Sequence, residues 1–424
     1  MKRILYALSS ALLAACAPDS GAALVDAGRQ PQPAETASDA FHQSLMVLDS
    51  HLDTPVYFHT PEYDFSKRGD FDIDGTHVDL PRMNAGGLDG GFWVIFTVQG
   101  PLDAASYSSA RTIALLRQMA IREMAAKYSA QTGLAFTAED AERLLAEGRK
   151  IVFQSMENSY PLGTDVSLLE TFYTGGLRMI APVHFRNNQF ADSATDVAPI
   201  FGGLSPLGEE LVREANRLGL VLDGSHASDD TVRDMLALST TPIILSHSGP
   251  KGVYDHPRNL PDDLLKAIAD DGGVIQINAY GAYLEVLTPS PERLEAMAEL
   301  EAKYGSDTSS MPPETLQAYR DARTALNQQF PPPRSTFEKF MEHLLYTLEL
   351  VGPDHVGIGA DWDGGGGVVG MKDVTDLPKV TAALLEAGYS QEDVAKIWGG
   401  NMLRLVREAE AARTATLVSP AVLN

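Results

Sequence analysis

Short apolar runs alternate with longer amphipathic segments along the chain from residue 41 onward. Each run is apolar at successive positions, which is typical of strands that are covered on both faces of a parallel sheet. The strands predicted in this way are 45–49, 91–98, 151–156, 177–183, 219–223, 242–246, 273–278 and 355–360.

The segments between these runs carry helix signals. Residues 205–219, SPLGEELVREANRLG, have a serine at the cap, a proline in the first turn and a closing glycine, and residues 261–273 follow the same plan. The interval 281–350 has no predicted strand, so we expect extra helices there, with an insertion around 281–335. Eight strands alternating with helices over about 380 residues favour a single-domain α/β fold, a (β/α)8 TIM-type barrel, over a doubly wound sheet.

The first residues differ in composition from the rest. Lys2 and Arg3 precede an apolar stretch, 4–15, that is too short to span a bilayer, and a Leu-Ala-Ala-Cys box then ends at Cys16, the only cysteine of the chain. This resembles a bacterial lipoprotein signal peptide, cut before a cysteine whose thiol is lipidated. The alternative is an ordinary secretory peptide with an incidental cysteine.

The lipoprotein interpretation divides the chain into four parts. Residues 1–15 would be the signal peptide, 16–40 the lipidated Cys16 with a disordered tether, 41–412 the barrel and 413–424 a C-terminal tail. The protein would be exported and anchored to a bacterial membrane through Cys16, in the periplasm or on the outer surface. A formal net charge of −24 argues against nucleic acid as a partner.

Nearly every predicted strand ends in a histidine or a carboxylate. Because the carboxyl ends of parallel barrel strands meet at one rim, we expect these side chains to converge. Imidazoles together with carboxylates are ligands of divalent transition metals. Glu157 follows a buried run and needs a positive partner, so it is expected to face one or two metal ions. The residues at the strand ends are His51, Asp53, Glu157, His184, His226, His247, Asp361 and Asp363.

The other histidines fall in helices or loops, or at a strand start. Structural roles are expected for His42, His59, His77, His256, His343 and His355.

Residues 45–406 resemble the membrane (renal) dipeptidase family of zinc peptidases, which belongs with the metal-dependent amidohydrolase-like barrels. The resemblance rests on LDSHLDTP, MEN, SHSGPKGVYDHPRNLPDD, GIGADWDG and IWGGNMLRL, among other motifs. It implies hydrolysis of the amide bond of dipeptides, including dipeptides with a D-residue at the C-terminal position as one option. A homodimer is one option for the oligomeric state, which the sequence leaves open.

The resemblance also implies a role for each site residue. His51 and Asp53 would bind one Zn²⁺, His226 and His247 the other, and Glu157 and a hydroxide would bridge the two. The substrate residues would be His184 at the carbonyl oxygen, Arg258 at the carboxylate, Tyr280 near that carboxylate, and Asp361 as the proton shuttle.

Four residues depart from the usual pattern of this family. Ser50 and the pair Asn158–Ser159 stand where glycines are usual, and Ala279 precedes the tyrosine. These changes leave the substrate preference open. Two other interpretations also stay open: a different dinuclear amide or lactone hydrolase on the same barrel, and a non-catalytic lipoprotein that binds a ligand. Arg258 distinguishes the first of these, because a lactone has no free carboxylate to bind.

Overall fold

The computed structural model describes residues 36–60, 63–305 and 311–418. The expected signal peptide, Cys16 and most of the expected tether lie outside these residues. The end of the tether was placed wrongly, because helix α1, Ala37–His42, begins within it and the compact body starts at Ala37. The expected tail at 413–424 was also placed too early, because the last helix, α16, continues to Val418.

All eight predicted runs overlap a strand, and two further short strands, β3 and β8, were missed. The observed strand β1 starts three residues later than the predicted run 45–49 and continues through the polar residues Ser50 and His51. The strands are β1 Leu48–Leu52, β2 Gly90–Phe96, β3 Thr132–Leu134, β4 Lys150–Glu157, β5 Leu177–Ile180, β6 Val221–Leu222, β7 Ile244–Pro250, β8 Asn259–Leu260, β9 Val274–Ile277 and β10 Val356–Ile358.

The two helices predicted in detail are confirmed. In α7, the Ser205 side chain accepts a hydrogen bond from the N–H of Gly208, and Gly219 closes the helix at φ 73°. The predicted helix at 261–273 is α9, which ends at Asp270. The helices besides α1 and α16 (Asn401–Val418) are α2 Phe71–Asp74, α3 Leu80–Gly86, α4 Ala104–Lys127, α5 Ala138–Ala146, α6 Leu169–Gly175, α7 Pro206–Leu218, α8 Asp229–Leu238, α9 Asp262–Asp270, α10 Gly281–Leu284, α11 Pro291–Tyr304, α12 Pro313–Gln329, α13 Phe337–Val351, α14 Leu377–Glu386 and α15 Gln391–Ala395.

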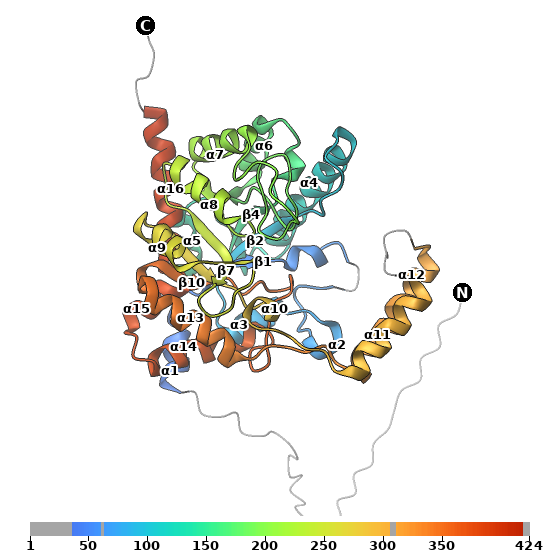
Figure 1. Ribbon diagram of the computed structural model, residues 1–424. Helices are drawn as coiled ribbons and strands as arrows, with labels where there is room; N and C mark the ends of the chain where they lie inside the picture. Colours follow the sequence, from blue (N-terminus) through green and yellow to red (C-terminus); the bar gives the residue numbers. More distant parts are fainter. Residues whose placement is uncertain (1–35, 61–62, 306–310, 419–424) are drawn as a thin grey trace, which may run out of the picture. The chain divides into compact units, whose positions relative to one another are not determined.

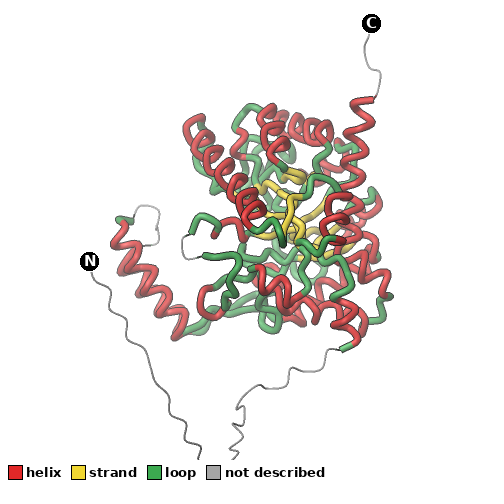
Figure 2. The backbone as a smooth tube through the Cα atoms, turned by 180° about the vertical axis from the view of Figure 1, so that it is seen from behind, coloured by secondary structure: helices red, strands yellow, loops and turns green. Residues whose placement is uncertain are grey.

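The strands lie in the middle with helices around them (Figures 1 and 2), and their pairing closes a parallel ring. One sheet has the order β1-β2-β4-β5-β6, and the other contains β10-β9-β7. Isolated parallel bridges join them on both sides, Leu52 to Trp362 beside β1 and β10, and Asp223 to Ile244 beside β6 and β7. The (β/α)8 barrel is thereby confirmed. We refer to these two junctions as the β1–β10 seam and the β6–β7 seam.

Buried aspartates strengthen both seams. At the β1–β10 seam, Asp49 accepts hydrogen bonds from the N–H of Ala360 (3.0 Å) and of His51 (2.8 Å). At the β6–β7 seam, Asp223 accepts one from the N–H of Ser246 (2.9 Å). Side-chain carboxylates therefore supplement the short backbone pairing where the two sheets meet, close to the ends of the strands.

The expected insertion is helical. Its longest helices, α11 and α12, pack against each other and extend away from the barrel strands in both views (Figures 1 and 2). None of the helices in the part of the chain that the structure describes is long and apolar enough to cross a bilayer.

Candidate active site

The predicted ligands converge at the carboxyl rim of the barrel. Glu157 is the last residue of β4, His51 and His247 lie within β1 and β7, and the others follow the ends of β1, β5, β6 and β10. Within each of three overlapping groups, the ligand atoms lie within 4.8 Å of one another. The groups are His51–Glu157–His247, Glu157–His184–His226 and His51–Asp53–Asp361.

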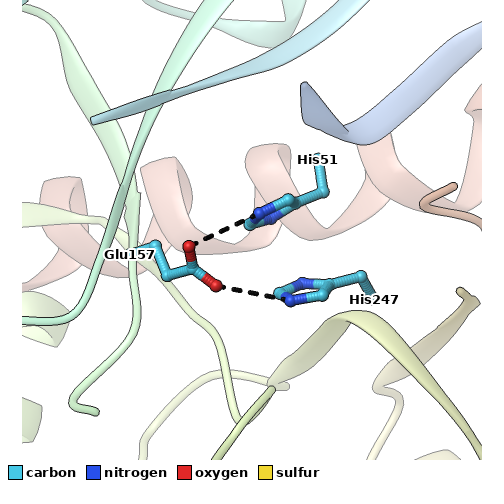
Figure 3. Close-up of side chains that lie close together, drawn as sticks. All are labelled: His51, Glu157 and His247. Carbon is cyan, nitrogen blue, oxygen red and sulfur yellow. Dashed lines mark ion pairs between the residues drawn. The ribbon is translucent and has the colours of Figure 1, made fainter. Parts of the chain in front are cut away.

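Glu157 lies at the centre of the site and presents a different oxygen to each side (Figure 3). Its Oε2 is 3.7 Å from Nε2 of His51, and its Oε1 is 3.1 Å from Nε2 of His226 and 3.4 Å from Nε2 of His247. His184 is the outermost of these histidines, with its Nε2 3.8 Å from the same Oε1. A carboxylate with imidazoles on both sides is suited to bridge two cations.

The site residues fit metal ions because they offer suitable ligand atoms and because several of these atoms have no hydrogen-bond partner. Both ring nitrogens of His51, Oδ1 of Asp53 and Nδ1 of His226 are buried without a hydrogen-bond partner. Buried polar atoms are normally paired, and a set of nitrogen and oxygen atoms without partners is the usual form of a transition-metal site. His51 with Asp53 can serve one cation and His226 with His247 another.

The histidines at the rim differ in the direction in which their pKa values are shifted. Burial lowers the pKa values of His226 and His247 well below the ordinary range, so both are neutral and can ligate a metal. Burial also disfavours the charged form of His51, but Glu157 and Asp53 outweigh it and raise its pKa well above the ordinary value. Burial, reinforced by the charges of Asp53 and Glu157, raises the pKa of Asp361 well above that of an exposed aspartate.

The backbone at the rim is strained. Among the described residues, the non-glycine residues with positive φ are Asn158 (70°), His226 (67°), Asp361 (62°) and Asp363 (65°), and all four follow barrel strands. This region costs free energy for any residue with a Cβ, and asparagine and aspartate tolerate it best. Asn158 thus explains one departure from the family pattern, since it can adopt the conformation that a glycine would adopt there.

The Asn158 side chain links three neighbouring loops. It donates a hydrogen bond to Gln99 after β2 (3.3 Å), accepts one from the N–H of Tyr160 (3.1 Å) and accepts one from Asn188 (2.9 Å) in the connection after β5. The same connection carries His184. Asn158 therefore helps to fix the loop of His184 relative to Glu157.

A contact that the sequence did not predict orients His247. Asp223 accepts a hydrogen bond from the Ser246 hydroxyl (2.6 Å), whose oxygen lies 2.8 Å from Nδ1 of His247. Ser246 is fully buried, so it fits an orienting role and not that of a nucleophile. Fixing one ring nitrogen directs the other, Nε2, into the site.

A cavity of about 330 Å³ opens above the ligands, and its lining includes Glu157, His184, Tyr280 and Asp361. The described residues that line it do not include Arg258, which is buried and donates to the carbonyl oxygen of His247 (2.8 Å). The Arg258 guanidinium lies 5.3 Å from the ring centre of Tyr283, a lining residue, so the arginine sits next to the cavity wall.

Residues expected to be structural mostly are. His42 lies 2.6 Å from the Thr381 hydroxyl, and His343 lies 2.9 Å from the carbonyl oxygen of Leu284. Asp363, at a strand end, accepts hydrogen bonds from Thr54 and from the N–H of His77, both at 2.6 Å, so it holds the rim together.

Known proteins resemble this chain over most of its length. Residues 35–419 match the membrane dipeptidase family, peptidase family M19. Dipeptidase tcpJ of Claviceps purpurea is 32% identical over 358 residues, which cover 82% of this chain and 73% of the relative. The crystal structure of the probable dipeptidase PvdM from Pseudomonas aeruginosa superposes with a TM-score of 0.75 at 32% identity, covering 88% of this chain and 98% of that one. A metallopeptidase from Rhodobacter sphaeroides, solved with a phosphinate mimic of the dipeptide L-Ala-D-Ala, gives a TM-score of 0.67 at 25% identity, covering 86% and 99%.

Proposed function

Because the chain belongs to the membrane dipeptidase family of metal-dependent hydrolases, we propose that it hydrolyses the amide bond of dipeptides with two zinc ions as cofactors. The observation that carries this proposal is the position of Glu157, whose two oxygens face His51 on one side and His226 on the other. His51 and Asp53 would hold one zinc ion, His226 and His247 would hold the other, and Glu157 would serve both. When bound, the ions supply an electrophile for the carbonyl oxygen and acidify a water molecule.

The protein's own residues supply the remaining steps. His184, at the cavity wall, donates a hydrogen bond to the carbonyl oxygen as negative charge develops there. Asp361 accepts the proton of the attacking water and delivers it to the leaving amine, a role that suits a buried carboxyl with a raised pKa. Tyr280 contacts the substrate carboxylate, and Arg258 attracts it by its positive charge from behind Tyr283.

The test combines metal analysis with a panel of dipeptides on the purified protein. We expect about two zinc ions per chain and cleavage of unblocked dipeptides, with D-residues at the second position included because a relative was solved with a mimic of L-Ala-D-Ala. Glu157→Gln should lower kcat/KM at least about 100-fold, whereas Glu170→Gln, at an exposed position, should leave it unchanged. A zinc-loaded protein that cleaves no dipeptide would overturn the proposal.

We also propose that lipidation of Cys16 anchors the protein to a membrane. Lys2, Arg3, the apolar stretch 4–15 and the Leu-Ala-Ala-Cys box support this proposal. In a bacterial host, the full chain should fractionate with membranes, and Cys16→Ala should release it from them, whereas Ser20→Ala should not. Equal fractionation of all three would contradict the anchor.

A further inference from the structure

One wall of the cavity is apolar. It includes Phe96 and Phe185, which we call the apolar wall. Phe185 is 47% exposed, and its ring centre lies 3.9 Å from that of His184 and 5.1 Å from that of His226. The Phe96 ring lies 4.9 Å from His184 on an edge-on approach. The apolar wall therefore directly adjoins the histidine that we place at the substrate carbonyl.

The apolar wall and Tyr280 lie on opposite sides of the barrel ring. Phe96 ends β2 and Phe185 follows β5, and these two strands flank β4, which carries Glu157. Tyr280 follows β9. The ring order places β9 four strands from β4 in either direction, through β5, β6 and β7 or through β2, β1 and β10. A ligand that spans the cavity from Tyr280 past Glu157 reaches the side of β2 and β5, where the apolar wall lies.

We propose that the apolar wall binds the side chain of the substrate's N-terminal residue, so that the preferred dipeptides begin with a large apolar residue. This inference rests on the proposed function, in which the substrate carboxylate lies toward Tyr280 and the scissile carbonyl at His184. With those two groups placed, only the N-terminal residue is left to occupy the side of β2 and β5. The cavity volume of about 330 Å³ suits a ligand of two residues.

The physical basis of the preference is desolvation. A leucine side chain loses water favourably against Phe96 and Phe185, whereas an aspartate there would lose hydration without gaining a hydrogen-bond donor from the wall. A pocket of this kind discriminates in proportion to the apolar surface that it covers. If Phe185 served only to pack against His184, substrates with different first residues would be cleaved with similar kcat/KM.

The experiment compares Leu-Ala, Gly-Ala and Asp-Ala, each with the second residue in the form that the enzyme cleaves. For the zinc-loaded wild type, we expect kcat/KM to be about 10-fold higher for Leu-Ala than for Gly-Ala, and lowest for Asp-Ala. Phe185→Ala should reduce the Leu/Gly ratio about 5-fold to 10-fold, and Phe185→Leu should retain most of it. The ratio does not depend on the fraction of active enzyme, so partial misfolding of a variant cannot imitate the effect.

Phe201→Ala is the matched control. Phe201 is 43% exposed in the same connection between β5 and α7 but does not line the cavity, so the ratio should stay at the wild-type value. Binding of phosphinate analogues of Leu-Ala and Gly-Ala should follow the same order without turnover. Cleavage of dipeptides with equal kcat/KM for the three substrates, or an unchanged ratio in Phe185→Ala, would overturn this inference alone. Absence of any dipeptide cleavage would overturn the proposed function as well.

Discussion

Nε2 of His226 lies 2.9 Å from Nε2 of His247, and both nitrogens approach the same oxygen of Glu157. Two neutral imidazoles cannot both donate a hydrogen to that carboxylate and also accept one from each other. A cation between the three atoms would satisfy all of them. The relationship therefore supports the proposed metal position on this side of Glu157.

Replacing His247 by alanine should remove one metal ion. We expect the zinc content to fall from about two to about one per chain, because the remaining residues of that position, His226 and Glu157, provide too few ligands. Plasma mass spectrometry of the purified variant measures this directly. His59→Gln, at an exposed histidine, serves as the control and should keep the wild-type content. Two retained ions in His247→Ala would contradict the assignment.

Metal binding should release protons at pH 7. The raised pKa of His51 means that its ring carries an extra proton there, and a protonated imidazole has no lone pair for a metal. Binding must displace this proton, so affinity should weaken as the pH falls below the raised pKa. Titration calorimetry in buffers of different ionisation enthalpy measures the release, and Asp361→Asn removes another group at the cavity whose pKa is raised. Release of about one proton should persist in that variant; its absence would refute the charged state of His51.

Asp361→Asn should lower kcat about 100-fold to 10,000-fold while both metal ions stay bound. An amide cannot take up and deliver the proton, but it preserves the shape of the carboxyl group. Steady-state kinetics together with metal analysis separate the two possible roles of Asp361. Loss of a metal ion in the variant would make the residue a ligand and not a proton shuttle.

At Asn158, whose backbone is left-handed, we expect glycine to be a more stable replacement than alanine, the reverse of the usual order. Both substitutions lose the hydrogen bonds to Gln99 and Asn188, but only glycine adopts φ 70° without strain. We expect Asn158→Ala to have a free energy of unfolding about 1 kcal/mol lower than that of Asn158→Gly in denaturant titrations. At Ser109, an exposed position inside α4, alanine should be the more stable of the two. The same order at both sites would argue against strain at Asn158.

Ser246→Ala should weaken metal binding without unfolding the protein. Nδ1 of His247 then loses its contact with the Ser246 hydroxyl, which Asp223 holds in place, and loss of such an outer partner typically lowers metal affinity about 10-fold to 100-fold. Competition with a chromophoric chelator measures the affinity. Ser239→Ala, at a serine whose hydroxyl bonds Thr241 and the Asn216 side chain and none of the site residues, should bind zinc as the wild type does. Equal affinities for both variants would show that Ser246 does not orient the ligand.

Much of the fold could be predicted because the barrel strands are covered on both faces and therefore contain apolar runs. Strands β3 and β8 were missed because Thr132–Leu134 and Asn259–Leu260 are too short to form an apolar run. The prediction ended the first strand at Asp49, because the next two residues are polar. In the structure these two residues continue β1 into the site. The family resemblance is confirmed, which favours a hydrolase over a non-catalytic binding protein.

The convergence of the ligands could also be predicted, since parallel strands bring their carboxyl ends to one rim. The contact from Asp223 through Ser246 to His247 could not, because it depends on how β6 and β7 align across the ring. The same holds for the position of Arg258 beside Tyr283, which no spacing in the sequence reveals.

The β6–β7 seam of the barrel has a consequence for one of the metal ions. His226 and His247 lie on opposite sides of this seam, whereas His51, Asp53 and Glu157 all belong to the sheet that runs from β1 to β6. A cation held by His226 and His247 would therefore cross-link the two halves of the ring, next to the isolated bridge between Asp223 and Ile244. Mutations that remove this cation should then loosen the barrel at that junction as well as impair catalysis.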